Sequence, residues 1–163
     1  MRVITNASPL HYLVLIASVS ILPELFGRIL VPPAVAAELQ HPRAPVEIRT
    51  WLASAPPWLD IHPVGRAPDI VLAHLDAGEQ EAIRLAEELR ADPRLMDDWE
   101  GRREAERRAL RVTGTLGVLE RAAERGLLDL PAILARLQAT DFCLPAKLVL
   151  DLLARDAGRK RQA

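Results

Sequence analysis

The sequence predicts an α/β fold, in which a parallel sheet of four to five short strands lies between two layers of helices. Short apolar runs rich in Val, Ile and Leu alternate along the chain with longer segments of helical periodicity. Pro and Gly punctuate the boundaries between these segments. The chain has 163 residues, of which 50% are hydrophobic, so it can bury the core of one ordinary domain.

Each expected strand is a short apolar run that ends at a polar or helix-starting residue. The first contains Val3 and Ile4 and stops before Asn6, and Pro63 restricts the third to an edge or an end of the sheet. The expected strands cover residues 2–5, 28–31, 59–64, 94–96 and 111–113.

The expected helices begin at capping residues or prolines. Ser8 followed by Pro9 predicts an N-cap and the first helical position, and the Pro32–Pro33 pair opens another helix. The expected helices cover about residues 8–19, 22–26, 32–40, 46–54, 69–75, 78–90, 99–110, 115–126, 131–138 and 145–154. We expect one domain over residues 1–157, with the helices at about 131–155 as an extension, followed by a loose basic tail at 158–163.

Composition limits the possible partners and compartments. The formal net charge is −1, so any nucleic-acid binding must come from a local patch. Cys143 is the single cysteine, which excludes an internal disulfide and fits a reducing compartment. The apolar run at 10–22 is interrupted by polar residues and is shorter than the roughly 20 residues that span a bilayer. We therefore expect a cytoplasmic protein with no membrane partner.

In a parallel α/β sheet, ligands bind beyond the carboxyl ends of the strands, so polar residues at those ends are candidate site residues. Asn6 directly follows the first strand, although it can also be a turn residue that bonds nearby backbone. At 100° per residue, Glu38 falls on the apolar face of its helix with Val35 and Leu39. A carboxylate there is costly unless it is paired or metal-bound. The alternative is a boundary glutamate that reaches solvent.

Two further acidic positions follow. Glu79 lies near the apolar stripe of the helix at 78–90, with Glu81 in reserve, although acids also favour a first helical turn through the helix dipole. Asp97 and Asp98 end an apolar strand, where adjacent carboxylates suit a divalent metal. Because Asp98 can also cap the next helix, Asp97 is the better ligand candidate.

For three further kinds of residue, the sequence allows both a functional and a structural role. Arg102 is the arginine nearest to Asp97 in a cluster that can hold phosphates or form a salt-bridged surface. Thr115 starts a helix that can bind phosphate through its free N–H groups, or it is simply a cap. The three tryptophans, Trp51, Trp58 and Trp99, are interpreted as core or interface residues rather than base-stacking platforms.

Five stretches together resemble a subgroup of PIN-domain proteins similar to the VapC-type toxins. They are NASPL at 6–10, VPPAV at 31–35 with Glu38, GEQEA at 78–82, DDWEGRR at 97–103 and TGTLGVL at 113–119. Each is weak alone, whereas all five in this order are fairly specific, and they span nearly the whole chain.

The resemblance implies a three-layer, Rossmann-like parallel sheet, magnesium or manganese in an acidic pocket, and hydrolysis of RNA. It also implies a small antitoxin protein as partner, and a homodimer. By position, the family's metal-binding residues fall on Asn6, Glu38, Glu79 and Asp97, with Asp98 adjacent to the last. The three carboxylates Glu38, Glu79 and Asp97 are then the catalytic candidates. Ser8 falls on a small hydroxyl residue of the family and, with Arg102 and Thr115, is a candidate for substrate binding.

Asn6 departs from the resembled pattern, which has Asp at this position. An asparagine offers a neutral carbonyl oxygen, so the expected metal affinity is lower. Two functions stay open at this point. One is a metal-dependent ribonuclease, and the other is a catalytically weakened module that binds nucleic acid or protein.

Overall fold

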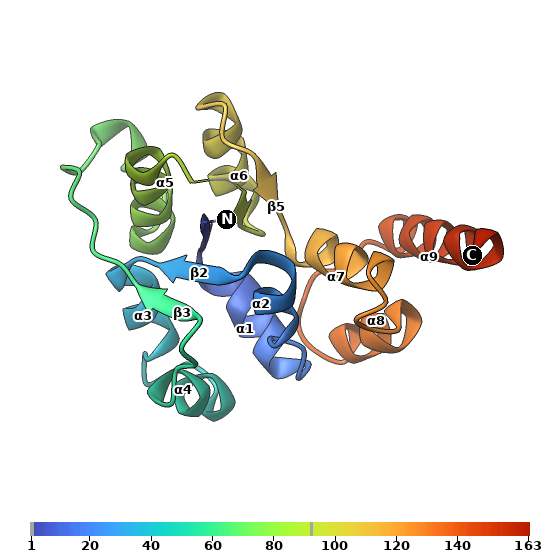
Figure 1. Ribbon diagram of the computed structural model, residues 1–163. Helices are drawn as coiled ribbons and strands as arrows, with labels where there is room; N and C mark the ends of the chain where they lie inside the picture. Colours follow the sequence, from blue (N-terminus) through green and yellow to red (C-terminus); the bar gives the residue numbers. More distant parts are fainter. Residues whose placement is uncertain (1, 92) are drawn as a thin grey trace. The chain divides into compact units, whose positions relative to one another are not determined.

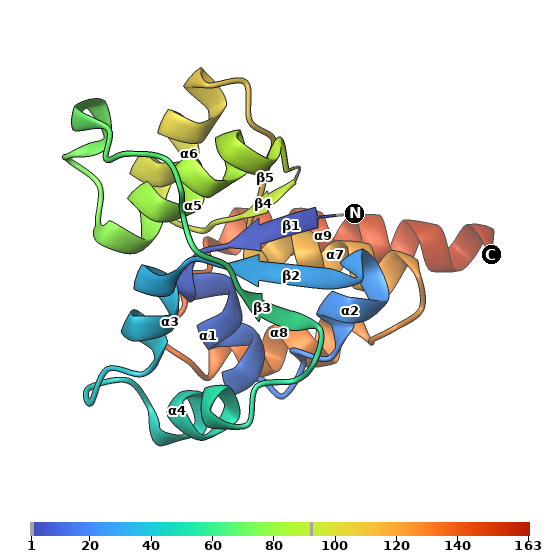
Figure 2. The same cartoon turned by 60° about the vertical axis from the view of Figure 1, so that its left-hand side comes forward.

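The computed structural model describes residues 2–91 and 93–163. It contains two compact units, Met1–Thr115 and Leu116–Ala163, which we call the N-terminal and C-terminal units. Most of their elements are labelled in Figure 1, and β1 and β4 are labelled in Figure 2.

The N-terminal unit contains one sheet in which all strand pairs are parallel, in the order β3-β2-β1-β4-β5. The strands are β1 (Arg2–Thr5), β2 (Arg28–Val31), β3 (Leu59–Ile61), β4 (Arg94–Leu95) and β5 (Val112–Thr113). This confirms the predicted α/β class with a parallel sheet. The strand expected at 59–64 ends at Ile61, before Pro63, and lies at an edge as Pro63 predicts.

Helices cover both faces of this sheet. They are α1 (Ala7–Leu15), α2 (Ile21–Phe26), α3 (Pro33–Leu39), α4 (Val46–Ala53), the 3-10 helix η1 (Ile70–Leu72), α5 (Ala77–Leu89) and α6 (Trp99–Arg107). The chain moves from β1 outward to β3 and then crosses back to β4 on the other side of β1. Since such crossovers are right-handed, this reversal places α1, α3 and α4 on one face and α5 and α6 on the other (Figure 2).

Two helices, α1 and η1, differ from those expected from the sequence. Helix α1 begins at Ala7 with Asn6 as its N-cap residue, so the prediction that Ser8 caps this helix is wrong. Ser8 instead lies in the first turn, and its hydroxyl is directed to another element. The expected helix at 69–75 is only the three-residue η1, where the Asp69 side chain accepts a hydrogen bond from Val71 N.

The core under α5 and α6 joins strands to helices. Ile4 of β1 and Leu30 of β2 are buried there with Ile83 and Ala86 of α5 and Ala105 of α6. Burying a side chain of this size contributes about 1.5–3 kcal/mol, so this layer fixes α5 and α6 against the sheet. The carboxyl ends of β1 and β4 are thereby held next to the first turns of these helices.

The C-terminal unit contains α7 (Thr115–Glu124) apart from its first residue, together with α8 (Leu130–Gln138) and α9 (Ala146–Gln162). The expected loose tail at 158–163 is wrong, because α9 continues through Gln162. Its last turns are held by ion pairs, of Arg159 with Glu124 at 3.2 Å and of Lys160 with Asp156 at 2.9 Å. The domain limits expected from the sequence stay a prediction. Within the described residues, no helix is long and apolar enough to cross a membrane.

Candidate functional site

The candidate site lies where the order of the strands reverses, between β1 and β4. The two strands pair in parallel, with Thr5 level with Leu95, so their carboxyl ends meet at the same edge. Asn6 follows β1 and its backbone N–H donates to Leu95 O at 3.1 Å, and Asp97 comes two residues after Leu95. In open α/β sheets this reversal is the usual place for a ligand, because the flanking helices diverge there.

Asp97 is held by three hydrogen bonds from two predicted site residues. Its Oδ2 accepts from Ser8 Oγ at 2.9 Å and from Thr115 Oγ1 at 2.7 Å, and its Oδ1 accepts from Thr115 N at 2.7 Å. The backbone N–H of Thr115, at the start of α7, therefore donates its hydrogen bond to the Asp97 carboxylate. Ser8 and Thr115 fix the orientation of Asp97.

Arg102 lies near the same carboxylate. Its Nη1 donates to Met96 O at 3.1 Å. A Cβ built on Gly114 would lie 2.7 Å from Arg102 Nη1 and 3.0 Å from Asp97 Oδ1, so both groups crowd around this glycine. Among the residues predicted to contact substrate, Arg102 thus brings a positive charge next to Asp97.

Glu79 is the most buried acid of the site, at 6% exposure. It forms a capping box at the start of α5, in which Glu79 N donates to Asp76 Oδ1 at 2.7 Å and Asp76 N donates to Glu79 Oε2 at 3.2 Å. Burial, followed by the charges of Asp76 and Asp98, raises the pKa of Glu79 to about 8. Without a counter-charge, Glu79 therefore keeps a proton at neutral pH.

Glu38 reaches the same helix start from α3. A Cβ built on Gly78 would lie 3.2 Å from Glu38 Oε2 and 3.4 Å from Asp76 Oδ1. Burial and then the charge of Asp76 raise the pKa of the Glu38 carboxyl. The side chain as a whole is exposed, so the expectation of apolar surroundings is wrong and the alternative of a boundary glutamate describes it better. The cause is that the buried stripe of α3, which contains Val35 and Leu39, is narrower than the helical wheel suggests.

Glu81, the reserve candidate for the third acid, has a structural contact. Its Oε2 accepts a hydrogen bond from Ala34 N at 2.8 Å, at the start of α3. Helix α3 has no side-chain cap of its own, so Glu81 satisfies one of its free N–H groups. This contact favours Glu79 over Glu81 as a ligand.

The acids form a row rather than a closed cluster. Asp76 is close enough to raise the pKa of both Glu38 and Glu79, and Asp98 hydrogen-bonds Glu79 and is the chain neighbour of Asp97. Across residues 2–91 and 93–163, however, no three His, Cys, Asp or Glu side chains make a ready-made metal-binding group. The side chains of Glu38, Glu79 and Asp97 therefore do not converge on one point in this structure, although the sequence had led us to expect this.

Asn6 supplies the test of whether a divalent cation fits here. Its Oδ1 is buried without a hydrogen-bond partner, and its side chain does not cap α1, so the alternative of a backbone-bonding turn residue is wrong. A buried carbonyl oxygen without a partner costs free energy that a bound cation would recover. The raised pKa values of Glu38 and Glu79 point the same way, because a cation would offset the burial of both carboxyls and their repulsion by Asp76. The oxygen donors of Asn6, Glu38, Glu79, Asp97 and Asp98 therefore fit a divalent cation.

Asp98 has the capping role expected of it, and its role as a metal ligand stays a prediction. Its Oδ1 caps α6 by accepting from Glu100 N at 2.9 Å and Gly101 N at 3.1 Å, as predicted, and its carboxylate also faces Glu79. Sequence reasoning missed Asp76 and Gly101. The Asp-x-x-Glu spacing of Asp76 and Glu79 is a recognisable capping-box signal. The sequence contains no comparable signal for Gly101, where an added Cβ would lie 3.1 Å from Glu79 Oε1.

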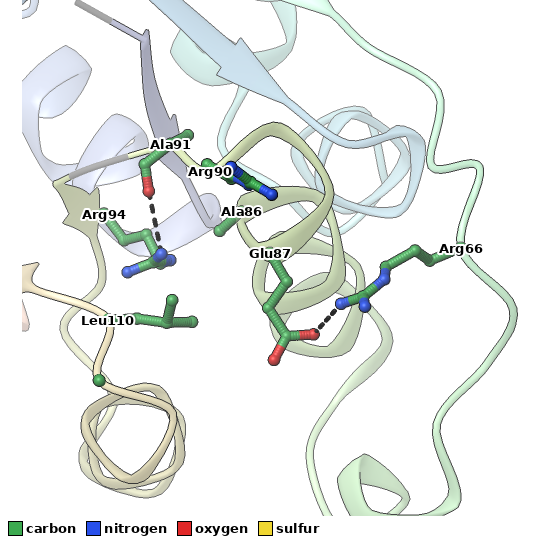
Figure 3. Close-up of a pocket in the computed structure, with 8 residues that line it drawn as sticks. Arg66, Ala86, Glu87, Arg90, Ala91, Arg94 and Leu110 are labelled. Atoms are coloured by element: carbon green, nitrogen blue, oxygen red, sulfur yellow. Dashed lines mark hydrogen bonds and ion pairs between the residues drawn. The ribbon is translucent and has the colours of Figure 1, made fainter.

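A separate cavity of ≈ 410 Å³ lies near the opposite ends of β4 and β5. Its lining residues are Arg66, Ala86, Glu87, Arg90, Ala91, Arg94, Ala109 and Leu110 (Figure 3). In it, Arg66 pairs with Glu87 at 2.6 Å, and Arg94 Nη2 donates to Ala91 O at 3.0 Å. None of the predicted site residues lines this cavity.

Comparison with known proteins gives the family. A family model described as a PIN domain matches residues 2–157, and no curated protein matches the chain. PIN domains are generally nucleases that bind nucleic acids and typically use divalent metals. The parallel sheet between two helical layers agrees with the PIN fold. Because the match covers nearly the whole chain, this protein belongs to the PIN-domain family.

Proposed function

We propose that the protein is a metal-dependent ribonuclease of the VapC-like toxin type, which hydrolyses RNA phosphodiesters. One observation carries the proposal. Where the strand order reverses, between β1 and β4, the buried Asn6 Oδ1 has no hydrogen-bond partner. It lies beside a row of carboxylates, and the pKa values of two of them, Glu38 and Glu79, are raised. This arrangement favours a divalent cation, and a cation beside a phosphodiester is the basis of nuclease chemistry.

The residues have separate roles in this proposal. Asn6, Glu38, Glu79, Asp97 and Asp98 hold magnesium or manganese, with Glu38, Glu79 and Asp97 as the catalytic acids. The bound ion would activate a water molecule and stabilise charge on the phosphodiester. Ser8 and Thr115 keep the Asp97 carboxylate oriented through the three hydrogen bonds described above.

Arg102 supplies the contact with substrate. Its guanidinium lies beside Asp97 Oδ1 at Gly114, where it can pair with a phosphate oxygen next to the scissile bond. Ser8 and Thr115 each give a hydroxyl hydrogen bond to Asp97. Their contribution to substrate binding is therefore indirect, through the carboxylate that they orient.

A second function is favoured by Asn6 itself. Its neutral carbonyl replaces a charge, and the carboxylates of the described residues do not form a closed metal group. A PIN-like module with weakened catalysis, which binds RNA or a protein, would have these properties. The toxin type further implies a small antitoxin partner, a homodimer and action in the cytoplasm, and light scattering of the purified chain tests the dimer.

RNA cleavage in manganese tests the proposal. The substrate is a pool of labelled single-stranded RNA, and the variants are Asp97→Asn, Asn6→Asp and the control Asp151→Asn, an exposed acid-to-amide change on α9. We expect weak cleavage by the native chain, a loss of about 100-fold or more in Asp97→Asn, a gain in Asn6→Asp and no change in the control. Folded variants that all fail to cleave would contradict the nuclease and support the binding module.

A further inference from the structure

Trp99 is exposed at the edge of the acidic site. It is the first residue of α6, directly after Asp97 and Asp98, and 66% of its surface is open to solvent. Trp99 was expected in the core or at an interface, and this exposure excludes only the core. A large aromatic side chain gains free energy by leaving water, so one that remains exposed beside a functional site is a candidate contact for a ligand.

Arg103 is stacked on this indole. Its Cζ lies over the Trp99 ring at 5.1 Å from the ring centre, and the two residues are four apart on one face of α6. The guanidinium covers one face of the ring. Because most of the side chain is still exposed, surface remains on which another flat group can stack.

The position of Trp99 relative to Asp97 is fixed by the start of the helix. Asp98 Oδ1 accepts hydrogen bonds from Glu100 N and Gly101 N, and Arg102 Nη1 donates back to Met96 O. Consecutive Cα atoms lie about 3.8 Å apart, so the Cα atoms of Asp97 and Trp99 are separated by at most about 7 Å. This separation is comparable with the span of one nucleotide in an extended strand.

We propose that Trp99, backed by Arg103, is a stacking platform for the nucleobase adjacent to the scissile phosphate, and that the substrate is RNA with an unpaired base at this position. The inference rests on the proposed nuclease function. Unpaired bases are recognised by stacking on aromatic rings and arginine planes, whereas the faces of paired bases are hidden within a helix. The positive charge of Arg103 also suits the adjoining phosphates and partly offsets the nearby acids.

Binding of two oligonucleotides tests the platform without relying on cleavage. The probes are a fluorescein-labelled octamer of oligoadenylate and an abasic octamer with the same ribose-phosphate backbone, measured by anisotropy in calcium. The variants are Trp99→Ala, Trp99→Phe and the control Ile70→Ala, which removes an apolar side chain that is 87% exposed on η1.

Stacking predicts a base-dependent loss. Trp99→Ala should weaken oligoadenylate binding about 10-fold, since a base stack contributes about 1–3 kcal/mol and each 1.4 kcal/mol is tenfold. Binding of the abasic octamer should not change, Trp99→Phe should retain most of the affinity, and Ile70→Ala should match the native chain. In RNA cleavage, Trp99→Ala should raise KM more than it lowers kcat.

The outcomes separate the platform from the proposed function. Native cleavage with unchanged oligoadenylate binding in Trp99→Ala overturns the platform and leaves the nuclease in place. Base-dependent binding through Trp99 without any cleavage supports the platform and contradicts the nuclease. An equal loss on both octamers, or no binding of either by the native chain, overturns the platform. Unchanged RNA binding in Trp99→Ala with loss of self-association would instead show a protein contact, and would also overturn it.

Discussion

Thr115 donates to both carboxylate oxygens of Asp97, through its backbone N–H to Oδ1 and through its hydroxyl to Oδ2, each at 2.7 Å. The two residues come from different segments, because Asp97 lies two residues after the end of β4 and Thr115 begins α7. This pair leaves the Asp97 carboxylate little rotational freedom. A ligand whose orientation is fixed in this way binds metal with a smaller entropic cost.

Removal of the Thr115 hydroxyl should therefore weaken the site. In Thr115→Val, the Asp97 Oδ2 loses one of its two hydroxyl donors, while the buried volume is nearly kept. We expect manganese affinity and kcat to fall about 10-fold, the lower end of what an outer-shell contact contributes. Isothermal titration with manganese and RNA cleavage measure both. Thr115→Ser restores the hydroxyl and should recover most of the loss; if it does not, Thr115 acts through packing alone.

The raised pKa of Glu79 predicts how stability depends on pH when metal is absent. The carboxyl has a pKa near 4.5 when unfolded and about 8 when folded. Between these values the folded chain retains a proton that the unfolded chain has released, so the free energy of unfolding falls as pH rises from about 4.5 to about 8. Below about 4.5 both states are protonated, and above about 8 neither is, so the curve levels at both ends.

Thermal unfolding in EDTA from pH 4 to 9 measures this effect. Glu79→Gln has no carboxyl to titrate at this position. The Tm of the variant minus the Tm of the native chain should therefore increase as pH rises from 4.5 to 8. Manganese must displace the proton, so its stabilisation of the native chain should increase over the same range and be lost in Glu79→Gln. A native Tm with the same pH dependence as the variant would show that Glu79 is not protonated at neutral pH.

Glu79 and Glu81 should respond in opposite ways to substitution. Glu81→Ala removes the acceptor for Ala34 N and should cost about 1 kcal/mol of stability, with manganese affinity within about twofold of native. Glu79→Ala should instead lower manganese affinity about 10- to 100-fold. Chemical denaturation and isothermal titration give the two quantities. If Glu81→Ala loses the greater share of manganese affinity, Glu81 is the third acid.

Local sequence patterns predicted the fold and the edge of the sheet on which the candidate site lies. Strands such as β1 and β4 are apolar runs that end at polar residues, so the polar residues Asn6 and Asp97 are placed at strand ends by the pattern alone. The parallel sheet then brings these ends together. Strand pairing thus makes two positions distant in the chain into neighbours.

Contacts between separate elements could not be derived from local patterns. The repulsion between Glu79 and Asp98 depends on how α5 packs beside α6, which no periodicity within either helix specifies. The exposure of Glu38 depends on how wide a stripe of α3 is buried by other elements. Likewise, the last turns of α9 are stabilised by Arg159 and Lys160 pairing with distant acids, which a basic tail sequence does not reveal.

Gly101 offers a final test of how closely Glu79 must be positioned. A Cβ at this residue would lie 2.6 Å from Met96 Sδ and 3.1 Å from Glu79 Oε1, so Gly101→Ala must displace one or both side chains. The methionine end is flexible but fully buried, and overpacking of this kind costs about 1–3 kcal/mol. Manganese affinity should fall with the displaced Glu79, as titration at pH 8 can show.

Gly158→Ala is the matched control for this change. Gly158 lies within α9, and nothing is within 4 Å of an added Cβ, so alanine should stabilise the helix by about 0.5–1 kcal/mol through its lower backbone entropy. Its manganese affinity should equal that of the native chain. Native stability and native manganese affinity in Gly101→Ala would show that the first turn of α6 can shift at little energetic cost. They would also show that Glu79 can hold a cation without this close approach to Gly101.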